Sequence, residues 1–143
     1  MSRNYYCEIN LHIVWHTKES AALLTPEIEP AAWRFLRKRI VDNRDVFVHE
    51  IGGTATHVHI ALSVPPTLMP STFIGELKGG TSHDVNHQFG LTKKLLEWQA
   101  GYGIVSFGTK DLEWVKKYIR NQKQHHANGN AVDRLERIMQ DHD

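Results

Sequence analysis

The sequence THVHIALSV, residues 56–64, decides the fold and contains the first candidate functional side chains. From Val58 to Val64 every second residue is apolar, whereas His57 and His59 occupy the positions just before Val58 and Ile60. Alternation with period two is typical of a β-strand with one face in the core. We therefore expect a strand that turns its apolar face to the core and holds two imidazoles side by side on the other face.

The segments on either side of this strand show the periodicities of a small mixed fold. Residues 5–16 also alternate, with Asn10 and His12 on the polar side. Pro65 and Pro66 end the strand over 56–64. In chain order we predict a strand over 5–16, a helix after Thr25-Pro26, strands over 46–51 and 56–64, a helix from Pro70, a strand over 104–107 and a helix over about 111–127.

This order, β-α-β-β-α-β followed by one more helix, predicts the α+β class with a ferredoxin-like split βαβ sandwich. The first two helices should cover one face of an antiparallel sheet, and the C-terminal helix should cover the other. We expect one domain over residues 1–143, with a short tail helix at about 131–140.

Composition excludes several classes of protein. The chain has a net charge of +1 and is 41% hydrophobic, and no apolar run reaches the length of a membrane span. The N-terminus lacks a secretory signal, and the single cysteine, Cys7, excludes an internal disulfide, so we expect a cytoplasmic protein without a membrane partner. Basic residues gather in two segments, which charge alone explains as solvated helix faces. They are Arg34, Arg37, Lys38 and Arg39, and Lys110, Lys116, Lys117, Arg120 and Lys123.

The predicted C-terminal helix supplies side chains for the polar sheet face. Tyr118 and Gln122 are four residues apart and project together from a helix. A phenol with a pKa of ~10 is a weak nucleophile, but beside a divalent cation that polarises a phosphate it can attack phosphorus. His57 and His59 would form half of such a metal site, with the amide oxygen of Gln122 as a third ligand. The alternative is an interfacial tyrosine beside a surface glutamine.

Several segments together resemble a known family. They are LHIVWHTK (11–18), His57-Val58-His59, LKGGTS (77–82), WQAGYG (98–103) and YIRNQKQHH (118–126). This set is similar to the insertion-sequence two-hundred-type transposases, the TnpA-like single-tyrosine HUH enzymes, which include relatives associated with repetitive extragenic palindromes. The resemblance runs from about residue 5 to residue 127.

The resemblance implies a transposase that cleaves and rejoins single-stranded DNA with hairpin ends. Mg²⁺ or Mn²⁺, held by His57, His59 and Gln122, would orient the phosphate that Tyr118 attacks to give a 5′-phosphotyrosine. A homodimer with active sites shared in trans is also implied, and Arg34, Arg37, Lys38, Lys117 and Arg120 are the candidate DNA contacts. Relatives often carry arginines after the first strand, where this chain has ESAA, residues 19–22.

Other functions remain open at this point. A catalytically silent hairpin-binding protein of the same fold would retain the DNA surface without the reaction. A ferredoxin-like dimer that binds a small molecule or a metal would use the histidines as ligands without DNA. Replication initiators and relaxases share the two-histidine motif, but those chains are usually longer.

Overall fold

Four strands form one antiparallel sheet in the order β2-β3-β1-β4. They are β1 (Ile9–His16), β2 (Phe47–Gly53), β3 (His57–Val64) and β4 (Gly103–Phe107). The computed structural model describes residues 4–43, 45–90, 94–129 and 131–138. The two strands with the clearest alternation in sequence, β1 and β3, are the central pair. The predicted α+β class and ferredoxin-like arrangement are confirmed.

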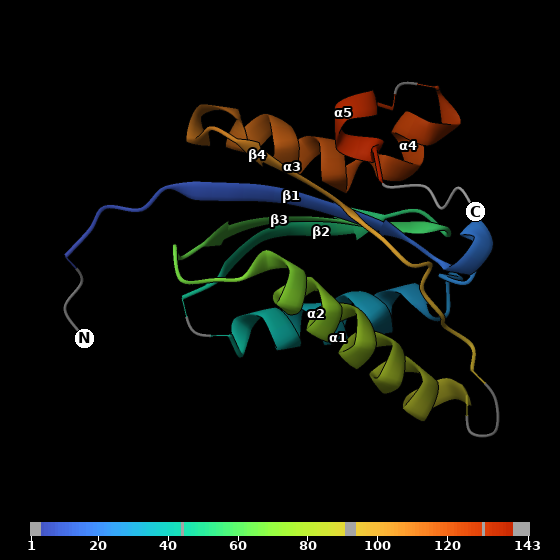
Figure 1. Ribbon diagram of the computed structural model, residues 1–143. Coiled ribbons are helices and arrows are strands. Elements are labelled where there is room, and N and C mark those ends of the chain that lie inside the picture. Colours follow the sequence, from blue (N-terminus) through green and yellow to red (C-terminus); the bar gives the residue numbers. More distant parts are fainter. Residues whose placement is uncertain (1–3, 44, 91–93, 130, 139–143) are drawn as a thin grey trace.

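Helices cover both faces of the sheet, as Figure 1 shows. On one face lie α1 (Glu29–Val41) and α2 (Pro70–Val85), and on the other lie α3 (Leu112–Arg120), α4 (Gln122–Ala127) and α5 (Asp133–Glu136). Shorter turns complete the order: η1 (Lys18–Ser20), a π-helical turn η2 (Asn86–Gly90) and η3 (Thr109–Asp111). No helix among the described residues is both long enough and apolar enough to cross a membrane.

The main core lies between the sheet and the first two helices. Val58, Ile60 and Leu62 of β3 are fully buried there, and they pack in one cluster with apolar residues of β1, α1 and α2. Each such side chain contributes about 1.5–3 kcal/mol through removal of apolar surface from water. The period-two pattern of β3 therefore fixes which face meets the helices, and it leaves the histidines on the opposite face.

The C-terminal helices are shorter than the sequence predicts. The single helix expected over about 111–127 is divided into α3 and α4 at Asn121, whose backbone (φ −102°, ψ 25°) departs from the helix. Asparagine favours such positions because its side chain competes for backbone hydrogen bonds. The expected tail helix at about 131–140 is α5, which ends before Arg137, a residue in extended conformation. Residues 139 and 140 of that prediction lie outside the described part of the chain.

Helix α3 lies close against the sheet because β2 carries a glycine beneath it. A Cβ atom at Gly52 would lie 2.5 Å from the backbone oxygen of Ile119. Val115 and Ile119 of α3 pack against Ala61 of β3 and form a second, smaller apolar cluster. The position of α3, and so of Tyr118, depends on this close approach.

We expect Gly52→Ala to destabilise the protein by about 1–3 kcal/mol, because the added methyl group must displace the α3 backbone. Urea unfolding followed by circular dichroism measures the change. Gly79→Ala is the matched control, because Gly79 is an exposed position of α2 with nothing within 4 Å of an added Cβ. This substitution should raise the free energy of unfolding by roughly 0.5–1 kcal/mol, since alanine has the higher helix propensity. A Gly52→Ala protein as stable as the wild type would show that α3 is not held by this contact.

Candidate active site

The two histidines of β3 lie on a buried polar face of the sheet. His57 is 4% exposed and His59 is 0% exposed. His12 of the neighbouring strand β1 is also buried, and its Nε2 atom lies 2.8 Å from Nδ1 of His59. Buried imidazoles need hydrogen-bond partners, and strand pairing supplies one to His59.

Both β3 imidazoles are oriented by partners at Nδ1. Nδ1 of His57 lies 2.9 Å from Oγ1 of Thr54 and 3.0 Å from Oγ1 of Thr56. Nδ1 of His59 has Nε2 of His12 as its partner. A partner at one ring nitrogen fixes the ring and leaves the other nitrogen free to bind a ligand, as is usual for metal-binding histidines. The two Nε2 atoms consequently face a common space under the C-terminal segments.

Helix α4 adds two possible metal ligands to this space, Gln122 and His126. Oε1 of Gln122 lies 3.3 Å from Nε2 of His57 and 3.1 Å from Nε2 of His126. The amide nitrogen of Gln122 donates to the backbone oxygen of Tyr118 over 3.2 Å, which turns Oε1 toward the histidines. Nε2 of His126 also lies 3.1 Å from Nε2 of His57.

A carboxylate from α5 completes the cluster. Oε1 of Glu136 lies 3.4 Å from Nε2 of His57, 3.1 Å from Nε2 of His59 and 3.3 Å from Nε2 of His126. One donor atom from each of these four side chains falls within 4.8 Å of the others. Three imidazoles with carboxylate and amide oxygens form a donor set that fits a divalent cation such as Mn²⁺.

Tyr118 lies at the edge of the same cluster. Its hydroxyl donates to Oε2 of Glu136 and accepts a hydrogen bond of 2.8 Å from the backbone N–H of Val132. The rings of Trp114 and His125 stack near the Tyr118 ring, with centroids at 5.6 Å and 4.8 Å. The residue is only 2% exposed, so its hydroxyl is covered by the chain's own C-terminal segment.

Burial lowers the pKa of two imidazoles at this site. It lowers the pKa of His12 to about 3, helped by the nearby His59. Burial also lowers the pKa of His59 and outweighs the attraction of Glu136. Neutral imidazoles are the form that binds metals.

The acidic partners of the cluster shift in opposite directions. Burial and the hydrogen bond to Glu136 raise the pKa of Tyr118 to about 12. For Glu136, burial opposes ionisation, but hydrogen bonds from His57 and His59 prevail and hold its pKa below the ordinary value. Glu136 is therefore an anion beside a neutral phenol.

The candidate DNA-binding residues divide between the two faces of the sheet. Arg34, Arg37 and Lys38 are exposed on α1, which lies on the face away from the histidine cluster (Figure 1). Lys117 and Arg120 are exposed on α3, the helix that carries Tyr118; Nη2 of Arg120 lies 3.1 Å from Oε1 of Glu50.

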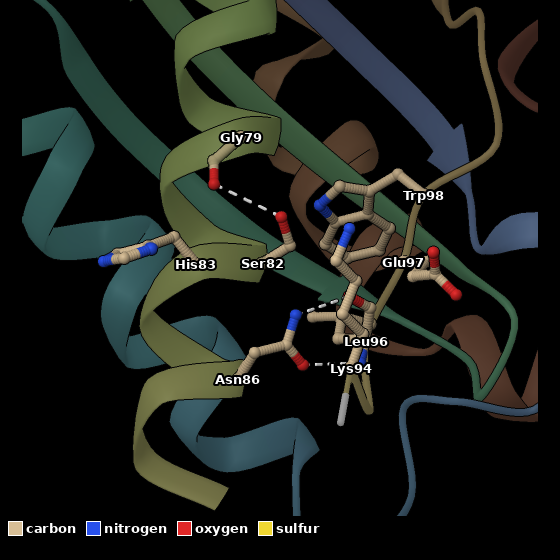
Figure 2. A pocket seen from close by; sticks show the side chains of 8 residues that line it. All are labelled: Gly79, Ser82, His83, Asn86, Lys94, Leu96, Glu97 and Trp98. Atoms are coloured by element: carbon tan, nitrogen blue, oxygen red, sulfur yellow. Dashed lines mark hydrogen bonds between the residues drawn. The ribbon is translucent and has the colours of Figure 1, made fainter. Parts of the chain in front are cut away.

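A separate hollow lies between α2 and residues 94–98, as Figure 2 shows. The side chain of Asn86 spans it, accepting from the backbone N–H of Leu96 over 2.8 Å and donating to the carbonyl of Leu96 over 2.9 Å. Nearby, Nζ of Lys78 donates to the carbonyls of Gln99 and Gly101 over 2.9 and 3.0 Å. These contacts hold the segment before β4, and the hollow shares no residue with the histidine cluster.

The sequence predicted part of the cluster. His57, His59, Tyr118 and Gln122, the four candidate residues from β3 and the last helix, come together in one place. Glu136 was missed, because nothing in its spacing links it to residues 18 and 79 positions earlier. His126 is not among the predicted ligands either, although it follows Gln122 by four positions and so projects from the same face of the helix.

Comparison with known proteins points to one family. A family model described as "Transposase IS200 like" matches residues 5–122. The transposase for insertion sequence element IS200 of Salmonella typhimurium is 30% identical over 125 residues, which cover 85% of this chain and 81% of the relative. The ISDra2 transposase TnpA of Deinococcus radiodurans is 25% identical over 125 residues, 84% of this chain and 88% of the relative.

Solved structures share the fold. A crystal structure of a Deinococcus radiodurans protein assigned as a transposase superposes with a TM-score of 0.69 at 21% identity, and covers 85% of this chain and 96% of that one. A REP-associated tyrosine transposase bound to a REP hairpin gives a TM-score of 0.61 at 17% identity, with 92% of this chain and 74% of that one covered.

We expect the metal-free protein to lose stability as the pH falls. Because the pKa of His12 is lower in the folded state, the unfolded state binds more protons below about pH 6.5, and the stability present above that pH declines toward the folded pKa of about 3. For His12 alone the loss between pH 7.5 and pH 5 is about 2 kcal/mol. Urea unfolding in EDTA at both pH values measures it. A His12→Gln variant should show a clearly smaller loss, and an equal loss in both proteins would contradict the assignment.

Proposed function

Since this chain belongs to the IS200-like transposase family, we propose that it cleaves and rejoins single-stranded DNA at the ends of a mobile element. One observation carries the proposal above the others. The hydroxyl of Tyr118 lies in the same buried cluster as the imidazoles of His57 and His59, with ring centroids of Tyr118 and His59 6.0 Å apart. A nucleophile beside a set of metal-binding side chains suits attack on a phosphodiester.

In the proposed reaction, the oxygen of Tyr118 bonds to the phosphorus of the scissile phosphate. The phenol loses its proton to solvent, the bond from phosphorus to the 3′ oxygen breaks, and the 3′ oxygen takes up a proton from solvent and leaves as a hydroxyl group. The product is a 5′-phosphotyrosine. A 3′-hydroxyl of another strand can attack the same phosphorus, which restores the phosphodiester and frees Tyr118. The energy of the original bond is kept in the tyrosine ester, so the reaction needs no nucleotide cofactor.

His57, His59 and Gln122 are the proposed ligands of Mg²⁺ or Mn²⁺. When bound, the cation would polarise the phosphate oxygens and stabilise charge that develops during attack. The residues of this chain position the ligands: Thr54, Thr56 and His12 orient the two imidazoles, and burial lowers the pKa of His59, which favours its neutral form. The imidazole-rich donor set suits Mn²⁺ better than Mg²⁺, which prefers oxygen ligands.

We propose that DNA approaches both faces of the molecule. Lys117 and Arg120 lie on the helix of the nucleophile and are candidates for the strand that is cut. Arg34, Arg37 and Lys38 lie across the sheet and are candidates for a hairpin at some distance from the cut. The similar REP-associated transposase is bound to a REP hairpin, which supports the hairpin as the substrate feature to test. The segment ESAA at residues 19–22 adds no basic group to this surface.

A function as a metal-binding protein without DNA cleavage is favoured by one observation. Tyr118 is 2% exposed, and a buried phenol cannot reach a DNA phosphate without movement of the segment that covers it. Formation of a covalent adduct distinguishes the two functions.

We expect Tyr118→Phe to abolish cleavage and adduct formation and to leave DNA binding nearly unchanged, because only the hydroxyl is lost. Labelled single-stranded oligonucleotides from the DNA that flanks the chain's own gene are incubated with Mn²⁺ and separated under denaturing conditions. Tyr102→Phe is the matched control and should still form the adduct. If the Tyr118→Phe protein forms the adduct, the nucleophile is another residue and Tyr102 is examined first.

The expected dimer with shared active sites stays a prediction, since the structure describes one chain. In that chain α3 lies across its own sheet, and Tyr118 and Gln122 meet their own His57 and His59. The short connection from β4 to α3 is compatible with exchange of that helix between two copies.

Mixing two inactive variants tests the arrangement. If the sites are shared, a Tyr118→Phe chain and a His57→Ala chain should together regain cleavage, because one site of the heterodimer combines intact histidines with an intact Tyr118. The adduct should then lie on the His57→Ala chain, which mass spectrometry of the adduct identifies. Each variant alone is the control. No activity from the mixture, with wild-type protein active under the same conditions, would mean that each site is built from one chain.

A further inference from the structure

The carboxylate of Glu136 occupies the space between the histidines and the nucleophile. Its Oε1 lies 3.1 to 3.4 Å from the Nε2 atoms of His57, His59 and His126, while its Oε2 accepts the hydrogen bond from Tyr118. The side chain thus has one oxygen on the metal-binding side of the site and one on the nucleophile.

Distances between the donor atoms match those of ligands around one metal ion. Metal–ligand bonds of about 2.1 Å at right angles put neighbouring donors about 3 Å apart. Oε1 of Glu136 has three imidazole nitrogens at such distances, and Oε1 of Gln122 lies 3.3 Å from His57 and 3.1 Å from His126. Five protein donors therefore converge, and only one position of an octahedral ion would be left.

A site that acts on DNA needs more room than this. A catalytic metal keeps open positions for its substrate, and the scissile phosphate must contact the metal through one oxygen while its phosphorus lies within reach of Tyr118. The Glu136 carboxylate would make the same two connections, because its Oε1 lies among the imidazole nitrogens and its Oε2 accepts from Tyr118. It is an anion with two acceptor oxygens, as a phosphodiester is, so the two cannot occupy the site together.

Apart from the contacts of Glu136 itself and the hydrogen bond from Val132 N–H to Tyr118, the segment that carries Glu136 is held by few contacts. Helix α5 has four residues, of which Leu135 is buried. Arg134 donates to the carbonyl of Ser106 over 2.6 Å. The carbonyl of Arg137 rests against Gly103, where a Cβ atom would lie only 1.9 Å from that oxygen. A short helix with little buried apolar surface opens at low cost compared with global unfolding.

We propose that Glu136 is a ligand of the metal in the DNA-free protein and that it gives up this place to the scissile phosphate. The C-terminal segment from Val132 to Arg137 then has to leave the site before Tyr118 can attack. The replacement of Glu136 by the scissile phosphate rests on the proposed function, whereas metal ligation by Glu136 does not depend on DNA cleavage.

Calorimetric titration of the DNA-free protein with Mn²⁺ tests ligation. We expect Glu136→Gln to weaken Mn²⁺ binding at least about tenfold, since an amide replaces an anionic ligand. Asp133→Asn is the matched control, because it removes a carboxylate of the same helix that is exposed and pairs with Arg137. It should bind Mn²⁺ as the wild type does. Unchanged affinity in Glu136→Gln would overturn the proposal.

Single-turnover cleavage of flanking single-stranded oligonucleotides at saturating Mn²⁺ tests the exchange. Glu136→Gln should cleave about threefold faster or more, because the open form is more populated. In a second variant, Gly103→Ala, the added methyl group displaces the carbonyl of Arg137 and changes no metal ligand. This variant should also cleave faster than the wild type. Slower or unchanged cleavage in Glu136→Gln would mean that Glu136 serves the reaction or leaves it unaffected, and the exchange would be wrong. If the wild type does not cleave at all, the proposed function fails, and the calorimetric result still decides whether Glu136 is a ligand.

Discussion

The pairing of β1 with β3 is the constraint on which the site depends. In this register Trp15 lies opposite Val58 on the core side, while His12 and His59 meet on the other side with ring nitrogens 2.8 Å apart. Strand geometry leaves no alternative, because a slip of one residue would exchange the apolar and polar faces of the strand. The energy that holds the histidines in place thus comes from the apolar residues behind them, packed against α1 and α2.

A buried polar face has to be covered and its polar groups satisfied. Helix α3 covers one end by apolar contact, through Val115 and Ile119 on Ala61, and can come this close because Gly52 has no side chain. The other end is covered by polar groups, where Gln122, His126 and Glu136 meet the imidazoles. Tyr118 lies at the border of the two regions, which explains both its burial and its raised pKa.

The order of strands and helices could be predicted from the sequence because the local spacing of apolar residues indicates each element. Alternation marks β1 and β3, and a spacing of four links Tyr118 to Gln122. Glu136 has no such signal: it lies on a helix of four residues, and its partners are distant in sequence. The division of the helix at Asn121 could not be predicted either, since the helical spacing of residues continues through this position. What could not be predicted is the part of the site that tertiary contacts alone create.

The closed cluster also limits which molecules can open it. Glu136 is an anion that accepts from Tyr118 and lies among three imidazoles. If it left without a replacement, several buried polar groups would lose a partner, at a cost of about 1–3 kcal/mol each. A neutral ligand cannot offset that loss, because it lacks a second acceptor oxygen with negative charge. A phosphodiester has both, and under the proposed function neighbouring phosphates would gain further contacts with Lys117 and Arg120 on α3. The proposed exchange is therefore opening by a nucleic-acid strand rather than by thermal motion alone.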